Sequence, residues 1–166
     1  ASAVFLDIRE DSCHSWALLQ KSRSKLARHS ATSSYTTRML HVIDHPVIRE
    51  RLTHIRSVDS ETAPFRHAMH DIARLMCFEV TRNLETKSLT VETPLTKTEG
   101  HALARPVVLV PILRAGIGLV NGFSEILTEA SVGYIGLCRD EKTHQPHSYY
   151  CKLPDPLSES EVILID

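Results

Sequence analysis

The sequence predicts an α/β fold in which helices flank a parallel sheet, and three features carry this prediction. Residues 107–110 are an uninterrupted apolar run of mostly β-branched side chains, which is typical of a strand buried on both faces. After a turn that contains glycine, apolar residues recur at helical spacing, and a second apolar run occupies residues 132–138. A strand, a helix and a strand within about thirty residues form a βαβ unit, so the two strands should be parallel with a right-handed crossover.

Before this unit the sequence predicts two helices, a strand and a loop. The first helix begins at Pro46, a residue that suits the first turn of a helix. Residues 88–93 alternate as a half-buried strand does, and residues 94–105 indicate a polar loop. The second helix covers about residues 63–83, with an apolar stripe made of Phe65, Met69, Ile72, Met76 and Val80.

After the unit, a third buried strand is expected at residues 162–165, directly before Asp166. Pro111 should end the strand that begins at residue 107, because proline lacks the N–H that a ladder needs. The third strand should leave an unpaired sheet edge and one uncovered apolar face.

Length and composition favour one domain with a hydrophobic core. The net charge of -1 argues against nucleic-acid binding through bulk electrostatics, and no apolar run approaches the roughly eighteen residues of a membrane span. The four cysteines have no CxxC spacing and the HExxH motif is absent. We therefore expect reduced thiols in a cytoplasmic protein, and no metal site built by the chain alone.

Residues 1–38 differ in composition from the rest of the chain. No acidic residue occurs between Ser12 and Leu40, whereas basic residues are spread among serines and threonines, which is typical of a flexible or targeting-like tail. We expect residues 1–38 to be an extension, either disordered or not native, ahead of a domain at residues 39–166.

The turn after the strand at 107–110 has the architecture of a phosphate site. Arg114 lies on this turn, Gly116 and Gly118 allow backbone to approach a ligand, and a helix starts next. A Walker P-loop is excluded because no glycine in the chain is followed by lysine. A dinucleotide fingerprint fits poorly, because the spacing from Gly116 to Gly122 is Gly-x-Gly-x-x-x-Gly.

A second arginine is expected at the same edge of the sheet. Arg139 follows the strand at 132–138, and ligands of open α/β sheets bind at the carboxyl ends of the strands. The sequence therefore predicts that Arg114 and Arg139 converge on one anion.

Three stretches of the chain resemble the uracil phosphoribosyltransferase family. Residues 111–116, Pro-Ile-Leu-Arg-Ala-Gly, are similar to the pyrophosphate loop of the family, and residues 39–46 resemble its first residues. Residues 139–154 resemble its second characteristic stretch. Cys138, just before that stretch, stands where the family is expected to have a tyrosine. The resemblance implies an incomplete phosphoribosyltransferase-type fold with a β-hairpin arm, of which residues 39–166 are the amino-terminal part.

The resemblance also implies a function and a site. The family transfers the phosphoribosyl group of 5-phosphoribosyl-1-diphosphate (PRPP) to uracil, giving UMP and diphosphate in pyrimidine salvage. PRPP would contact Arg114, Arg139, Asp166 and the backbone of Ala115 and Gly116. Mg²⁺ would be bound mainly through PRPP. The resemblance also implies GTP as an effector. It implies a homo-oligomer in which residues 139–154 form an arm that packs on the partner subunit.

Two alternatives stay open at this point. The PRPP signature loop and the uracil-binding segment would follow Asp166, so the 166-residue chain is expected to be inactive by itself. A non-catalytic nucleotide-binding or assembly module derived from the same fold is one alternative, and a dinucleotide enzyme recognised through Gly116 and Gly118 is the other.

Overall fold

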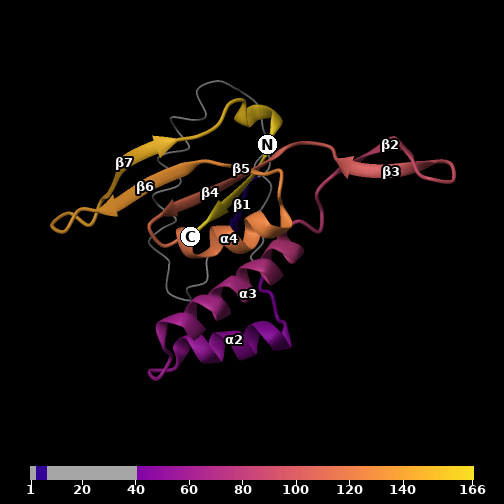
Figure 1. Ribbon diagram of the computed structural model, residues 1–166. Coiled ribbons are helices and arrows are strands. Elements are labelled where there is room, and N and C mark those ends of the chain that lie inside the picture. Colours follow the sequence, from indigo (N-terminus) through magenta and orange to yellow (C-terminus); the bar gives the residue numbers. More distant parts are fainter. Residues whose placement is uncertain (1–2, 7–40) are drawn as a thin grey trace.

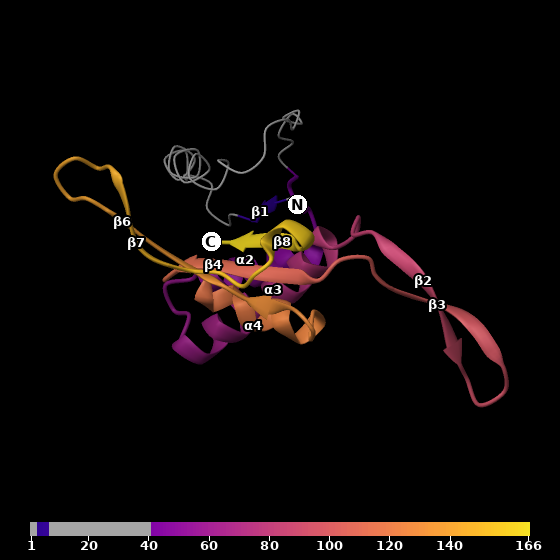
Figure 2. The same ribbon diagram turned by 90° about the horizontal axis from the view of Figure 1, so that it is seen from above.

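The computed structural model describes residues 3–6 and 41–166, and it has an α/β architecture with the helices on one face of a mostly parallel sheet (Figures 1 and 2). The sheet order is β1-β8-β4-β6-β7, with β5 also paired to β4, and β2 and β3 form a separate hairpin. The bounds are β1 (Ala3–Leu6), α2 (Pro46–Arg56), α3 (Thr62–Val80), β2 (Thr86–Glu92), β3 (Lys97–Leu103), β4 (Val107–Leu113), α4 (Ile117–Ile126), β5 (Ser131–Val132), β6 (Tyr134–Arg139), β7 (Pro146–Lys152), the 3₁₀-helix η2 (Leu157–Glu159) and β8 (Glu161–Ile165).

Strand β4 lies at the centre of the sheet, and its two faces belong to two different apolar clusters. Val107 and Leu109 pack with α3, α4 and β8, whereas Val108, Val110 and Ile112 pack with Leu164 on the other face. All are buried, so the predicted strand buried on both faces is confirmed. The βαβ unit is confirmed as well, because β5 and β6 pair with β4 in parallel.

The prediction that Pro111 ends this strand is wrong, because β4 continues past it. On one side Pro111 pairs with Ile165 of β8. On the other side β5 pairs as far as Leu109, whose carbonyl accepts from Gly133, and β6 pairs only from Ile112 onward. Pro111 therefore lies where the ladder changes from β5 to β6, a position at which no N–H donor is needed.

Both predicted helices are present, and the second helix is shorter than predicted. Pro46 opens α2 after His45, whose Nδ1 accepts from the backbone N–H of Val47 at 3.2 Å. Helix α3 ends at Val80 because the Thr81 hydroxyl donates to the Cys77 carbonyl at 2.7 Å. Ile72 and Met76 of the predicted stripe are buried, whereas Phe65 is 40% exposed.

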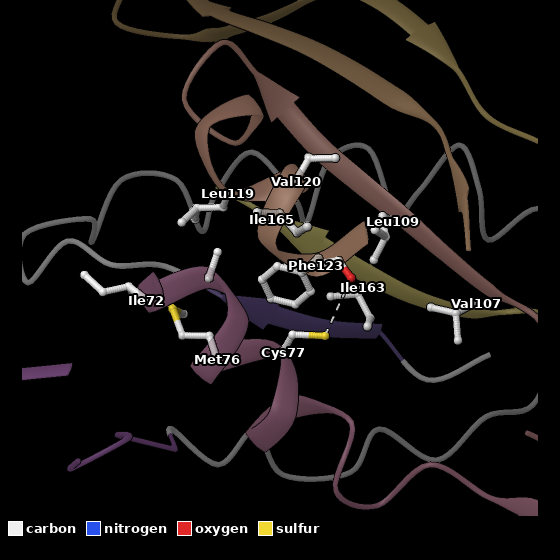
Figure 3. Packing of buried hydrophobic residues seen from close by; sticks show 11 residues of the cluster. Ile72, Met76, Cys77, Val107, Leu109, Leu119, Val120, Phe123, Ile163 and Ile165 are labelled. Atoms are coloured by element: carbon white, nitrogen blue, oxygen red, sulfur yellow. Dashed lines mark hydrogen bonds between the residues drawn. The ribbon is translucent and has the colours of Figure 1, made fainter. Parts of the chain in front are cut away.

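Helices α3 and α4 approach each other closely where Gly122 meets α3. A Cβ on Gly122 would lie 2.6 Å from the Ala73 Cβ and 2.8 Å from the His70 carbonyl oxygen, so only glycine fits there. Next to it Phe123, fully buried, fills the space between the helices and the sheet (Figure 3). This contact fixes α4, and with it the turn that precedes α4.

Two further predictions about strands are corrected. Residues 94–105 are not a loop, because β3 pairs with β2 in an antiparallel hairpin closed by Thr93, which accepts from the backbone N–H of Thr96 at 3.1 Å. The strand expected at residues 132–138 is divided at Gly133 into β5 and β6, and only Gly136 of β6 is buried, because β6 continues with β7 as a two-stranded ribbon beyond the end of β4.

The prediction that β8 forms an unpaired edge of the sheet is also wrong. Ala3–Leu6 forms β1, which pairs in parallel with residues 162–165. Thus four residues of the proposed extension belong to the sheet, and the rest of residues 1–38 lies outside the described residues. The domain boundary at residue 39 stays a prediction.

We expect Cys77 to resist alkylation in the native protein. Burial raises the pKa of its thiol to about 11, and its Sγ faces the Phe123 carbonyl oxygen at 4.0 Å (Figure 3). Since the thiolate is the reactive form, iodoacetamide at pH 8 should modify exposed Cys138 and leave Cys77 intact until urea unfolds the chain. Peptide mapping measures both sites, and equal native rates would contradict the packing of α3 against α4.

Candidate functional site

The predicted site residues lie on three neighbouring strands. β8, β4 and β6 are adjacent and parallel in the sheet, so their carboxyl ends share one edge. Asp166 directly follows β8, Arg114 directly follows β4, and Arg139 is the last residue of β6. The sequence-based placement of all three at one edge of the sheet agrees with this register.

The turn between β4 and α4 is held against the end of β8. Gly116 is buried, its N–H donates to the Ile112 carbonyl at 2.9 Å, and the Leu113–Arg114 peptide bond is cis. A Cβ on Gly116 would overlap the carbonyl oxygen of Ile165 and lie 2.9 Å from the Ile112 nitrogen. Gly116 therefore allows close approach of the chain's own backbone, whereas the sequence predicts close approach to a ligand.

Gly118 differs from Gly116 because it faces open space. No heavy atom lies within 4 Å of the position that a Cβ would take there. Gly118 is exposed in the first turn of α4, so its absence of a side chain leaves room at the edge of the sheet.

Arg114 is exposed and carries a positive charge that the described residues leave uncompensated. Its neighbour Ala115 is exposed too, and the N–H of Ala115 has no backbone acceptor in the part of the chain that the structure describes. Five other described arginines pair with carboxylates, namely Arg49, Arg51, Arg74, Arg82 and Arg105, whereas Arg56, Arg66 and Arg139 have no such pair among the described residues. Arg114 has no such ion pair among the described residues, so its guanidinium is available to an anion.

Arg139 lies at the same edge but farther out. Leu113 pairs with Gly136, and Arg139 is three residues beyond Gly136, about 10 Å along an extended strand. It is exposed at the end of β6, opposite Pro146 of β7. The structure thus brings Arg114 close to the end of β8, whereas the convergence of Arg114 and Arg139 on one anion stays a prediction.

Asp166 is partly buried and adjacent to the turn that bears Arg114. The contact between Gly116 and the carbonyl of Ile165 places that turn over the end of β8, one residue before Asp166. The turn that carries Arg114 and Ala115 therefore lies next to the backbone that leads into Asp166. A carboxylate, a guanidinium and a backbone N–H can hold a phosphate ester, with the carboxylate directed to its hydroxyl groups or to an associated cation.

A depression on α3 and α4 is lined by His70, Asn121, Ser124 and Glu125, and it includes none of the predicted site residues. Residues 3–6 and 41–166 contain no group of three His, Cys, Asp or Glu side chains placed to hold a metal ion. Among the helices described, none is long and apolar enough to span a membrane.

The fold and the edge just described are typical of α/β proteins that bind phosphorylated ligands at the carboxyl ends of parallel strands. The chain belongs to the uracil phosphoribosyltransferase family, whose model matches residues 42–166. This is the family that residues 111–116 and 139–154 resemble.

Individual relatives agree with the family match. The chain is 45% identical over 128 residues to a uracil phosphoribosyltransferase of Malacoplasma penetrans, covering 77% of this chain and 62% of that protein. It is 48% identical over 126 residues to one of Ligilactobacillus salivarius, covering 75% and 60%. A solved structure of the AQ2163 protein from Aquifex aeolicus matches with a TM-score of 0.71 and 27% identity, over 77% of this chain and 62% of that one. The chain spans about 60% of the length of these relatives.

Proposed function

We propose that this chain binds PRPP and serves the transfer of its phosphoribosyl group to uracil, giving UMP and diphosphate in pyrimidine salvage. The observation that supports this most directly is Arg114, exposed and without an ion pair among the described residues, on a turn packed over the end of β8. Membership of the uracil phosphoribosyltransferase family supports PRPP and uracil as the proposed substrates.

The proposed mechanism rests on stabilising a leaving group. A ring nitrogen of uracil displaces diphosphate from C1 of the ribose through a cationic, oxocarbenium-like transition state, and negative charge develops on the departing diphosphate. Arg114 and Arg139 would hold this diphosphate, because guanidinium is permanently charged and binds phosphate through two parallel hydrogen bonds. The exposed backbone N–H of Ala115 would add a neutral donor beside them, whereas the N–H of Gly116 already donates to the Ile112 carbonyl.

Mg²⁺ would enter this site together with PRPP. The described residues offer Asp166 as the carboxylate at this edge of the sheet, and no cluster of three protein ligands. This donor set fits Mg²⁺, which keeps several waters and is commonly bound by one or two carboxylates plus substrate phosphates. When bound, the ion neutralises part of the diphosphate charge.

We also propose a cytoplasmic location and GTP as an effector. Both proposals rest on membership of the family and on no particular described residue.

The PRPP site is tested with two arginine variants. Arg114→Ala and Arg139→Ala should each weaken PRPP binding about tenfold to a hundredfold, because a hydrogen bond to a charged group contributes about 1.5–3 kcal/mol. Isothermal titration of the chain with PRPP and Mg²⁺ measures the Kd, and thermal unfolding should be unchanged. Arg105→Ala is the matched control, since Arg105 pairs with Glu161 at 3.6 Å at the opposite end of β8.

An unchanged Kd in the Arg114 and Arg139 variants would overturn the assignment. Failure of the unmodified chain to bind PRPP would favour the non-catalytic assembly module. Binding of NAD in place of PRPP would favour the dinucleotide alternative.

We further propose that the hairpin of β2 and β3 assembles the chain into a homo-oligomer, a role that the resemblance gives to residues 139–154. In Figures 1 and 2 this hairpin projects away from the sheet. Its two faces differ: Leu89, Val91 and Gly100 lie on one face, where a Cβ on Gly100 would lie 2.6 Å from the Val91 Cγ2, whereas Ser88 and Glu99 are hydrogen-bonded at 2.6 Å on the other.

A second copy of the chain is the proposed occupant of the apolar face. Leu89 and Val91 are 39% and 38% exposed, although they alternate with polar residues as in a half-buried strand. A two-stranded hairpin is marginally stable by itself, so packing against another surface would stabilise it. The hairpin leads into the start of β4 through Leu103, far from the edge that bears Arg114, so assembly there leaves the site open.

The assembly proposal is tested by a pair of adjacent substitutions. Val91→Lys should shift the oligomer toward monomers, at least tenfold in dissociation constant, because it places a charge on the apolar face. Thr90→Lys, opposite Glu99 on the polar face, should leave the oligomer intact. Sedimentation equilibrium measures both. Monomeric unmodified chain, or equal behaviour of the two variants, would contradict the proposal.

A further inference from the structure

The turn between β6 and β7 is closed by one carboxylate. Oδ1 of Asp140 accepts three hydrogen bonds, from the backbone N–H of Lys142 at 3.0 Å, from that of Thr143 at 2.7 Å and from the Thr143 hydroxyl at 2.9 Å. The backbone of Asp140 also closes the ladder, since its N–H donates to Gln145 and its carbonyl accepts from His144, both at 2.9 Å. We call Asp140 with the donors of Lys142 and Thr143 the turn clasp.

The turn clasp lies at the end of a segment with little other support. β6 pairs with β4 only at Ile135 and Gly136, and from Leu137 onward its ladder partner is β7 alone. The register shifts between Gly136 and Leu137, which separates the outer ribbon from the sheet. Two-stranded ribbons are marginal in water, so the direction of this outer part depends strongly on how its turn is closed.

Arg139 is the residue immediately before the turn clasp. It is the last residue of β6, exposed, and without an ion pair among residues 41–166. The backbone on its carboxyl side is fixed by the five hydrogen bonds of Asp140, and the backbone on its amino side belongs to the unsupported ribbon. The turn clasp therefore restrains the backbone directly after Arg139.

We propose that Asp140 is a positioning residue, which acts through Arg139 and orients its guanidinium toward the diphosphate of PRPP. This inference rests on the proposed function, because it requires that Arg139 bind PRPP. Asp140 is assigned this role because its Oδ1 is engaged by the three donors of the turn.

The turn clasp is intact at the pH at which the protein would work. Hydrogen bonds, first from the Thr143 backbone N–H, then from the Thr143 hydroxyl and the Lys142 N–H, lower the pKa of Asp140 below 3.8. A group with a lowered pKa contributes above its unfolded value and loses this contribution as the pH falls through the folded value. The turn clasp should therefore be constant at neutral pH and open only in acid, because the pKa of Asp140 is lowered.

The test is a double-mutant cycle on the complete chain, with PRPP binding in the presence of Mg²⁺ as the readout. Asp140→Ala removes all three acceptor contacts, and Thr143→Val removes the hydroxyl without a change of charge. Each should weaken PRPP binding, by about threefold to tenfold for Asp140→Ala and less for Thr143→Val. Thr143→Ser keeps the hydroxyl and is the matched control, with binding unchanged.

Coupling to Arg139 separates positioning from a merely structural role. In the Arg139→Ala background, Asp140→Ala should cause no further loss of PRPP affinity, because the group that it orients is gone. If Asp140→Ala costs the same with and without Arg139, or if Thr143→Val has no effect, the proposal is wrong. If Arg139→Ala itself leaves PRPP binding unchanged, the proposed site fails, which is a different result from failure of the turn clasp.

Discussion

The close approach of Gly116 to the carbonyl of Ile165 is the contact on which the candidate site depends. The carbonyl oxygen of Ile165 occupies the space that a Cβ on Gly116 would take, and this contact joins the turn after β4 to the end of β8. The two strands are already paired through Pro111 and Ile165, so the ladder and this contact fix the same edge twice. The turn that carries Arg114 and Ala115 is thereby held against Ile165, the residue before Asp166.

The position of α4 adds a second constraint on the same turn. Gly122 brings α4 against α3 at a distance that excludes a larger residue, and buried Phe123 packs beneath it. Because α4 begins one residue after Gly116, a shift of the helix would move the turn away from β8. Glycine thus has two packing roles here, and the conformational freedom of glycine is secondary, since no glycine among the described residues has a positive φ.

The sequence was sufficient to predict those parts of the fold in which local pattern and tertiary structure agree. The runs at 107–110, 132–138 and 162–165 have few polar residues, so their strands and the parallel βαβ unit follow from periodicity. β3 was missed because Lys97–Leu103 is mostly polar, and because its pairing with β2 leaves both strands largely exposed. β1 was missed since four residues pair with a strand more than 150 residues later, which no local pattern encodes.

The same distinction applies to the candidate site. That Arg114, Arg139 and Asp166 share an edge follows from the rule for parallel strands, and the register agrees with it. How far Arg139 extends beyond that edge depends on the length of the ribbon and on the irregularity between Gly136 and Leu137, and neither is visible in the sequence. A cation at the end of a ribbon reaches an anion only if the ribbon is held in one direction. The hydrogen bonds of Asp140 therefore matter to a site whose other cation, Arg114, is fixed by packing at the sheet itself.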